Sequence, residues 1–243
     1  MCRDSKLFLL TTVCLLQGQS PEENASPPKQ WRLQLYQELG YNYWIGLPAA
    51  LRTTVTGAGS IKFNLKLLPY INIGKFYIGI GGGMVIREVR FEKPVLLFDE
   101  NNKLSYDTPM LPPKTQAKSK LQLGYFHVPI EIGLHWRKLH LAAFGFGELL
   151  SWSKYKFKYR QGQELTRYLV FGNSIFHTEL VQYGVGGRIG WRGIGIFGSY
   201  NPSALWHKNE GPPGVHPLQI GIYIYNSPKV PKKKIRNSSV TYL

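Results

Sequence analysis

The amino-acid sequence predicts an all-β protein, an eight-stranded antiparallel up-and-down transmembrane β-barrel. Three observations lead to this fold class: segments of alternating apolar and polar residues recur after residue 28, their connections alternate strictly between short and long, and aromatic residues gather at the segment ends. Transmembrane barrels have short turns on one side, longer loops on the other and aromatic girdles at both interfaces. No segment shows the 3.6-residue periodicity of a long amphipathic helix.

The first residues have the anatomy of a secretory signal peptide. A short basic region precedes an apolar run over residues 7–16, which is too short for a spanning helix. We expect residues 1–19 to be the signal peptide, with cleavage near Gly18 or Ser20, and residues 20–29 to form a short linker. A buried N-terminal helix is the alternative interpretation.

Both cysteines, Cys2 and Cys14, lie within this predicted signal peptide. The mature chain is therefore expected to have no disulfide and no thiolate metal site. An exported protein without disulfides needs another source of stability, such as a closed sheet or a lipid environment.

The first two predicted strands are residues 31–45 and 61–70. The first sets Leu33, Leu35, Leu39, Tyr41, Tyr43 and Ile45 against Arg32, Gln34, Glu38 and Asn42. The second sets Ile61, Phe63, Leu65 and Leu67 against Lys62, Asn64 and Lys66. Strict alternation of this kind indicates a strand with one apolar and one polar face.

The third predicted strand, "KFYIGIGGGMVIREVRF" over residues 75–91, carries large apolar residues on one parity and mostly glycine on the other. Glycine weakens a strand because it costs backbone entropy and offers nothing to pack. We therefore expect its glycine parity to face a crowded lumen, where it makes room for larger side chains.

The fourth predicted strand, residues 121–136, has the cleanest alternation, and the fifth covers residues 139–159. The parity of the fifth slips around Glu148, so the alternation does not assign Glu148 to either face of the sheet. The remaining strands are residues 179–191, 194–200 and 217–225, which brings the number to eight, as expected for an even-numbered barrel.

The solvent on each side of the sheet decides between two barrel classes. Several strands suit the roughly 9 to 11 residues that cross a bilayer at a tilt, which favours an apolar parity facing lipid and a polar, glycine-rich parity filling the lumen. A soluble, lipocalin-like ligand carrier is the alternative, and it requires the apolar parity inside.

Four charged residues fall on the polar parity: Glu38, Arg87, Glu131 and Arg188. Charges in a narrow lumen are costly unless they pair, so we predict an inward network that closes the barrel to solutes. A gate or proton path is its functional interpretation, and a structural plug is the alternative.

The segments "YFHVPIEIGLHWRKLHLAAFGFGELL" and "YGVGGRIGWRGIGIFGSYNPSALW", with the closing "LQIGIYIY", resemble the PorT-like outer-membrane β-barrel family of Bacteroidota. The resemblance covers roughly residues 30–225, which we assign to the barrel. It implies a location in the cell outer membrane and a structural, binding or secretion-associated (type IX-like) role. The chain departs from the family in the basic tail over residues 226–243, which we expect in the periplasm.

No catalytic motif is found, and we expect no enzyme activity, no cofactor and no metal site. The histidines lack metal-binding spacing, and "GIGGG" lacks the Lys-Ser/Thr of a phosphate loop. An outer-membrane lipid-modifying enzyme is the second function class, for which His207 with Ser203 and Glu210 is the one local candidate.

The formal net charge is +16, with 30 Lys plus Arg against 14 Asp plus Glu. We expect the partners to be outer-membrane lipid, lipopolysaccharide and periplasmic or secretion-machine proteins, and no nucleic acid because the chain is expected to be exported. The long loop over residues 94–118 and the strand end "KYKFKYRQG" are the candidate surfaces; a merely solvated loop is the alternative.

Overall fold

The computed structural model describes residues 31–48, 51, 60–91, 93–111 and 115–226. The predicted signal peptide and linker, both cysteines, and the predicted tail beyond Asn226 lie outside these residues. The strands are β1 (Trp31–Ile45), β2 (Ile61–Ile73), β3 (Phe76–Ile80), β4 (Gly82–Arg90), β5 (Leu96–Glu100), β6 (Lys103–Asp107), β7 (Gln116–Trp136), β8 (Leu139–Gln161), β9 (Glu164–Gly172), β10 (Val181–Trp191), β11 (Ile194–Tyr200) and β12 (His216–Tyr225).

Helical structure in the described part of the chain is confined to the short 3-10 helix η2 (Ile175–His177) and a single 3-10 residue at Leu51. None of the helical structure described is long and apolar enough to cross a membrane. The predicted all-β class is therefore confirmed.

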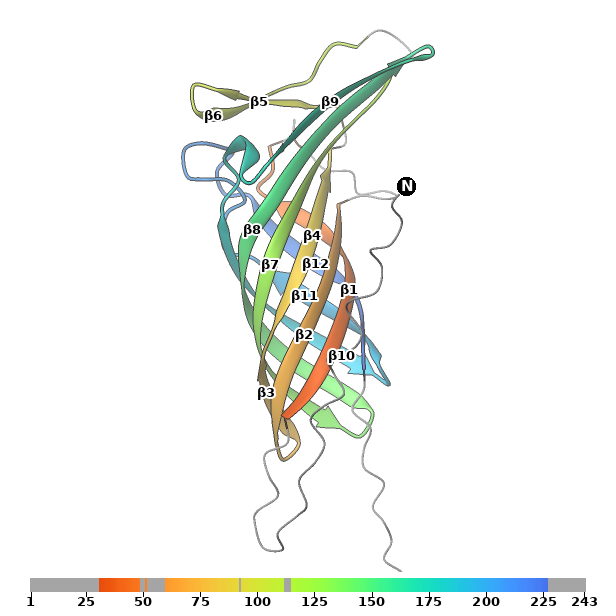
Figure 1. The fold of residues 1–243 in the computed structure, drawn as a ribbon, viewed down its shortest axis with the longest axis vertical. Coiled ribbons are helices and arrows are strands. Elements are labelled where there is room, and N and C mark those ends of the chain that lie inside the picture. The colour runs from red at the N-terminus through yellow and green to blue at the C-terminus, as the bar shows by residue number, and fades with distance from the viewer. Residues whose placement is uncertain (1–30, 49–50, 52–59, 92, 112–114, 227–243) are drawn as a thin grey trace, which may run out of the picture. The chain divides into compact units, whose positions relative to one another are not determined.

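Ten of the strands form one antiparallel sheet. β1 pairs with β2 and β12, β2 pairs with β3 and β4, both of these pair with β7, and the pairing then runs through β8, β10 and β11 back to β12. The pairings return to their starting strand, so the sheet curves round on itself as Figure 1 shows.

The predicted count of eight strands differs from the observed one. The third predicted strand is interrupted at Gly81, which separates β3 from β4. β9 pairs with β8 alone, and β5 and β6 form a separate two-stranded sheet. β5, β6 and β9 all lie in long connections that the sequence analysis predicts as loops.

The short connections lie at one end of the sheet. Two residues join β2 to β3, β7 to β8 and β10 to β11, with the pairs Ile73↔Phe76, Trp136↔Leu139 and Trp191↔Ile194 closing the turns. Positive φ values at Arg192 (53°) and Gly193 (97°) match the primed turns that two-residue hairpins favour. The long connections, including β5, β6, β9 and η2, lie at the other end.

The parity slip in β8 is a β-bulge. Gly124 of β7 pairs with Trp152, whereas the next residue, Tyr125, pairs with Leu150, so Ser151 has no partner in the register. One extra residue moves every later side chain to the opposite face. Glu148, before the bulge, therefore faces the lumen and is buried.

The glycines of the third predicted strand make room for backbone as well as for side chains. A Cβ added to Gly81 or Gly83 would lie closer than 3.0 Å to the carbonyl oxygen of Leu67 or Leu65 in the neighbouring strand. At Gly81 and Gly83 the absent side chain therefore makes room for backbone, which the sequence analysis did not expect. At Gly133 of β7 it makes room for a side chain, as expected, because a Cβ would meet the ring of Tyr77.

The sheet exposes its apolar parity and buries its polar parity. On β7, Ile130 and Ile132 are 53% and 57% exposed, whereas Glu131 between them is 0% exposed. We use the name apolar belt for the outward side chains that repeat this arrangement: Leu35, Leu39, Phe63, Leu65, Ile78, Ile80, Phe126, Val128, Ile130, Ile132, Val185, Ile189, Ile196, Ile220, Ile222 and Ile224. A lipocalin-like barrel needs the reverse arrangement, so the structure contradicts that alternative.

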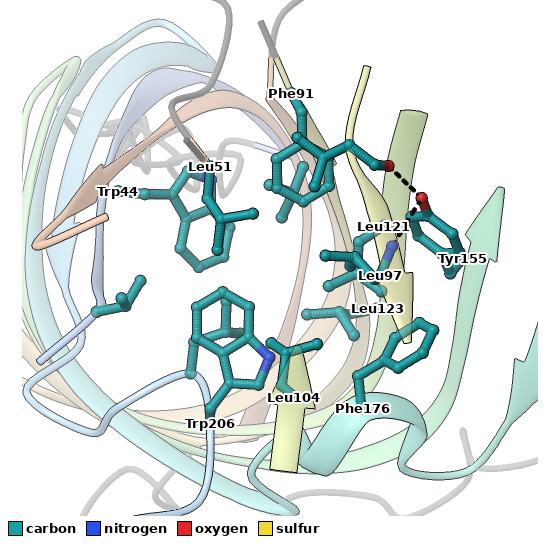
Figure 2. Close-up of a cluster of buried hydrophobic side chains, with 14 of the residues drawn as sticks. Trp44, Leu51, Phe91, Leu97, Leu104, Leu121, Leu123, Tyr155, Phe176 and Trp206 are labelled. Carbon is teal, nitrogen blue, oxygen red and sulfur yellow. Dashed lines mark hydrogen bonds between the residues drawn. The ribbon is translucent and has the colours of Figure 1, made fainter. Parts of the chain in front are cut away.

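Apolar side chains fill the end of the sheet that carries the long connections. Figure 2 shows this loop-end core, in which Trp44 and Trp206 lie inside the ring of strands together with residues from β5, β6, β7, β8 and η2. Leu97 donates a backbone hydrogen bond of 3.3 Å to the hydroxyl of Tyr155, which donates in turn to the carbonyl of Val95. The loops therefore pack onto the strand ends as a cap.

Candidate functional site: the filled lumen

The lumen side of the sheet carries buried charges of both signs. Four cations and three carboxylates there are nearly or fully buried: Lys62, Lys66, Arg87, Arg188, Glu38, Glu131 and Glu148. Each occupies the inward parity of its strand, where alternation places every second side chain. An isolated buried charge is very costly, so the way these groups pair determines what the site can do.

Glu38 of β1 is the centre of the larger cluster. Its carboxylate lies 2.7 Å from Nζ of Lys66, 3.0 Å from an Nη of Arg188 and 3.8 Å from Nζ of Lys62. Asn64 donates a 2.8 Å hydrogen bond to the same carboxylate. Three cations around one carboxylate leave an excess of positive charge that other acceptors must balance.

Arg188 of β10 supplies that balance because it contacts a second carboxylate. Its Nη1 lies 2.9 Å from Glu131 of β7. The guanidinium also lies over two aromatic rings, with its Cζ 4.4 Å from the centroid of Tyr36 and 4.3 Å from that of Phe144. A planar guanidinium can lie flat on a ring while its edge forms ion pairs, and Nζ of Lys66 lies over the same two rings at 5.0 and 5.1 Å.

Arg87 of β4 belongs to a second cluster. It forms an ion pair with Glu148 of β8 and donates a 2.6 Å hydrogen bond to the side-chain oxygen of Gln182 in β10. His127 of β7 lies 2.9 Å from the other Glu148 oxygen through its Nδ1. These four side chains come from four strands, and both partners of Arg87 lie on strands that are not neighbours of β4 in the sheet.

The four residues singled out in the sequence are all buried, and three of them meet. Arg188 lies between Glu38 and Glu131, whereas Arg87 lies in the second cluster with Glu148. The sequence analysis did not single out Lys62, Lys66, His127, Glu148 or Gln182. Lys62 and Lys66 could have been found from their parity in the second predicted strand; Glu148 was hidden by the bulge.

Tyrosine and histidine side chains form a layer next to the larger cluster, toward the short turns. Tyr36 donates a 2.7 Å hydrogen bond to Glu131, and Tyr77 bonds the same oxygen. His140 lies 2.6 Å from the Tyr77 hydroxyl through Nε2 and 2.8 Å from the Tyr223 hydroxyl through Nδ1. The layer satisfies Glu131 and extends the polar contacts across the lumen.

The candidate triad for a lipid-modifying enzyme is not assembled. His207 contacts Glu179 at 3.0 Å, Glu210 contacts His177 at 3.0 Å, and the hydroxyl of Ser203 bonds the backbone of Tyr183. The contact between His207 and Glu210 is a backbone hydrogen bond of 3.2 Å. Their side chains thus serve as loop contacts.

The described residues contain no group of three or more His, Cys, Asp or Glu side chains arranged to hold a metal ion. The charged side chains of the lumen link strands that are not neighbours in the sheet, in both clusters. Such contacts make the interior a packed, charged core.

No family model matches the chain, and no curated protein does. Among solved structures, the chain is similar to Ail, the attachment invasion locus protein of Yersinia pestis, with 12% identity and a TM-score of 0.34 over 80% of this chain and 97% of Ail. It is also similar to a triple mutant of the porin of Rh. blastica, with 10% identity and a TM-score of 0.20 over 81% of this chain and 100% of the porin. TM-scores this low do not establish a shared fold, so the resemblance to the PorT-like family stays a prediction and the function is inferred from the chain's own geometry.

Proposed function

We propose that this chain is an outer-membrane β-barrel protein whose lumen is filled by its own side chains. The observation that carries the proposal is the inverted burial, with the apolar belt outside and seven charged residues inside. Burying a large apolar side chain is worth about 1.5–3 kcal/mol, so a belt of this size left in water would be strongly unfavourable. Lipid removes that cost.

In this proposal β3 and β4 make one crossing of the membrane, which gives eight crossings in total. The two-residue turns β2–β3, β7–β8 and β10–β11 lie at one end of the sheet, together with the first residue of β1 and the last residue of β12, and the long connections lie at the other. Outer-membrane barrels place short turns in the periplasm and long loops outside, which fixes the proposed orientation.

The proposed role is structural or binding, without diffusion of solutes and without catalysis. Two charge clusters and the loop-end core occupy successive levels of the interior. Small barrels are commonly filled in this way, and the fill replaces the aqueous channel of a larger porin.

The test is fractionation of the full chain followed by gel migration and bilayer recording. We expect the protein in the outer-membrane fraction, faster migration when unboiled than when boiled, and no steady conductance in a planar bilayer. Recovery in the soluble fraction, or identical migration before and after boiling, would refute the membrane assignment. A steady ion current would refute the filled lumen.

A secretion-associated role is the finer proposal, and it is supported by the sequence resemblance alone. Its test is co-purification from outer membranes in mild detergent. A stable periplasmic or secretion partner supports it, and a lone barrel protein argues against it.

A further inference from the structure

Figure 1 shows that β7, β8 and β9 extend together beyond the other strands of the sheet, and the outward parity of this extension is basic. We use the name cationic face for the outward basic side chains of this extension and of the end of β4: Arg90, Lys118, Lys120, Lys154, Lys156, Lys158, Arg160 and Arg167. The inward parity of the same segments, for example Leu121 and Phe157, is buried in the loop-end core. One face is thus fixed by packing and the other is free to bind.

The cations of this face lie directly opposite one another. Lys118 pairs with Lys158, which pairs with Arg167 on β9, and Lys120 pairs with Lys156. Like charges in directly opposite positions destabilise a sheet. The arrangement therefore favours a bound anion that relieves the repulsion.

Few carboxylates are available to relieve it. In the part of the chain that the structure describes, the ion pairs of this face all involve Glu88, which contacts Arg90 and, at 2.8 Å, Lys120. Partial desolvation, together with the neighbouring Arg167 and Lys158, lowers the pKa of Lys156. The charges are crowded enough to perturb one another.

Two hollows lie between these side chains. One of about 260 Å³ is lined by Lys118, Lys158, Arg160, Leu165 and Arg167. The other, also of about 260 Å³, is lined by Arg90, Lys118, Ser119, Lys120, Lys156 and Lys158. Lys118 and Lys158 line both, so the two hollows form neighbouring recesses with cations on each side.

The position of the face selects the anion. Lys154 lies five residues beyond Leu149, which is 53% exposed and pairs with the belt residue Phe126, or about 16 Å along the strand at ~3.3 Å per residue. The strand tilt shortens that height, and this places the first cations in the headgroup layer next to the hydrocarbon core.

We propose that the cationic face binds the phosphate groups of phosphorylated glycolipids in the surrounding membrane leaflet. The inference rests on the proposed function, because it needs the apolar belt in lipid. Phosphates would lie between opposed cations of β7, β8 and β9, and the acyl chains of the same lipid would cover the belt below.

The experiment compares two triple variants of the full chain in detergent micelles. One is Lys156→Gln/Lys158→Gln/Arg167→Gln, and the other is Lys103→Gln/Lys138→Gln/Lys208→Gln, which removes the same charge from exposed positions elsewhere. The probes are a bisphosphorylated glycolipid and the same glycolipid without phosphate, with binding measured by calorimetry.

We expect the first variant to bind the bisphosphorylated lipid at least about tenfold more weakly than the native chain, because each basic residue near a membrane surface adds to the attraction of anionic lipid. The control variant should bind like the native chain, and the phosphate-free lipid should bind weakly to all three. Equal binding by both variants, or equal binding of both lipids, would overturn the proposal.

Two competitors separate other sources of anion. Displacement of the glycolipid by inorganic phosphate would assign the face to free phosphate, and displacement by poly-glutamate would assign it to an acidic polypeptide; either result overturns the lipid assignment. Each protein is first tested for heat-modifiable migration. If the native chain does not show heat-modifiable migration, the proposed function is refuted. If it does, and the variant of the cationic face binds the lipid as well as the native chain, this inference alone is refuted.

Discussion

Arg188 of β10 and Glu38 of β1 form a buried ion pair with an N–O distance of 3.0 Å, although β11 and β12 separate their strands in the sheet. The pair therefore crosses the lumen. Because Arg188 also contacts Glu131 of β7, it joins three walls of the barrel through one side chain.

Replacing Arg188 with Met should strongly destabilise the barrel. Two carboxylates would lose a cation while remaining buried, and breaking a buried pair from one side costs about 3–5 kcal/mol. Urea unfolding in detergent micelles, followed by the shift from the compact to the extended gel band, measures the change.

The matched control is Lys208→Met, which removes a cation from an exposed loop position. It should change the free energy of unfolding by less than about 0.5 kcal/mol. If Arg188→Met unfolds at the same urea concentration as Lys208→Met, the buried ion pairs do not stabilise the barrel.

Gly83→Ala should destabilise the barrel, whereas Gly82→Ala should be tolerated. A Cβ at Gly83 would overlap the carbonyl of Leu65 and lie 2.6 Å from Cβ of Lys66, whereas a Cβ at Gly82 meets nothing within 4 Å. Overpacking of this kind costs about 1–3 kcal/mol. The unfolding midpoint of Gly83→Ala should therefore lie below that of Gly82→Ala. Equal midpoints would show that the backbones of β2 and β4 do not approach so closely.

Stability in acid should depend on Glu88 at the edge of the cationic face. Burial raises its pKa, but hydrogen bonds from Lys120 and Arg90 outweigh burial and lower the pKa below 4.5. A lowered carboxyl pKa stabilises the fold above the unfolded value, and the contribution is lost as the pH falls through the folded value.

Glu88→Gln should therefore reduce stability at neutral pH by less than about 1 kcal/mol, because the group is partly exposed. The difference between the native chain and the variant should shrink toward zero as the pH falls below 4.5. Unfolding curves at a series of pH values measure it, and a difference that stays constant over this range would contradict the assigned pairing.

His177→Ala should loosen the cap at the loop end. His177 lies 2.8 Å from Asp99 of β5 and 3.0 Å from Glu210, so it joins η2 to two other connections. Proteinase K should cleave these loops several-fold faster in His177→Ala than in the control Asp107→Asn. Asp107 is exposed and lies in the β5–β6 hairpin, which also contains Asp99. Equal cleavage rates would show that the apolar contacts alone hold the loops.

The sequence predicts which charged residues face inward better than it predicts the number of strands. Alternation places Glu38, Glu131 and Arg188 on one parity, and burial follows from that parity. Partners across the lumen depend on closure and on the register of distant strands, which no local pattern contains. The bulge at Ser151 has no signature beyond a slip in parity, so the face of Glu148 could not be assigned.

The central claim, that the apolar belt faces lipid, is tested most directly by spin labels at single cysteines. Ile130→Cys and Ile196→Cys lie on the belt, Lys138→Cys and Lys208→Cys lie at opposite ends, and Cys2 and Cys14 are replaced by Ser. In lipid vesicles the belt labels should collide readily with oxygen and hardly with a water-soluble nickel complex, and the end labels should show the reverse. Belt labels that are fully accessible to the nickel complex would contradict the account.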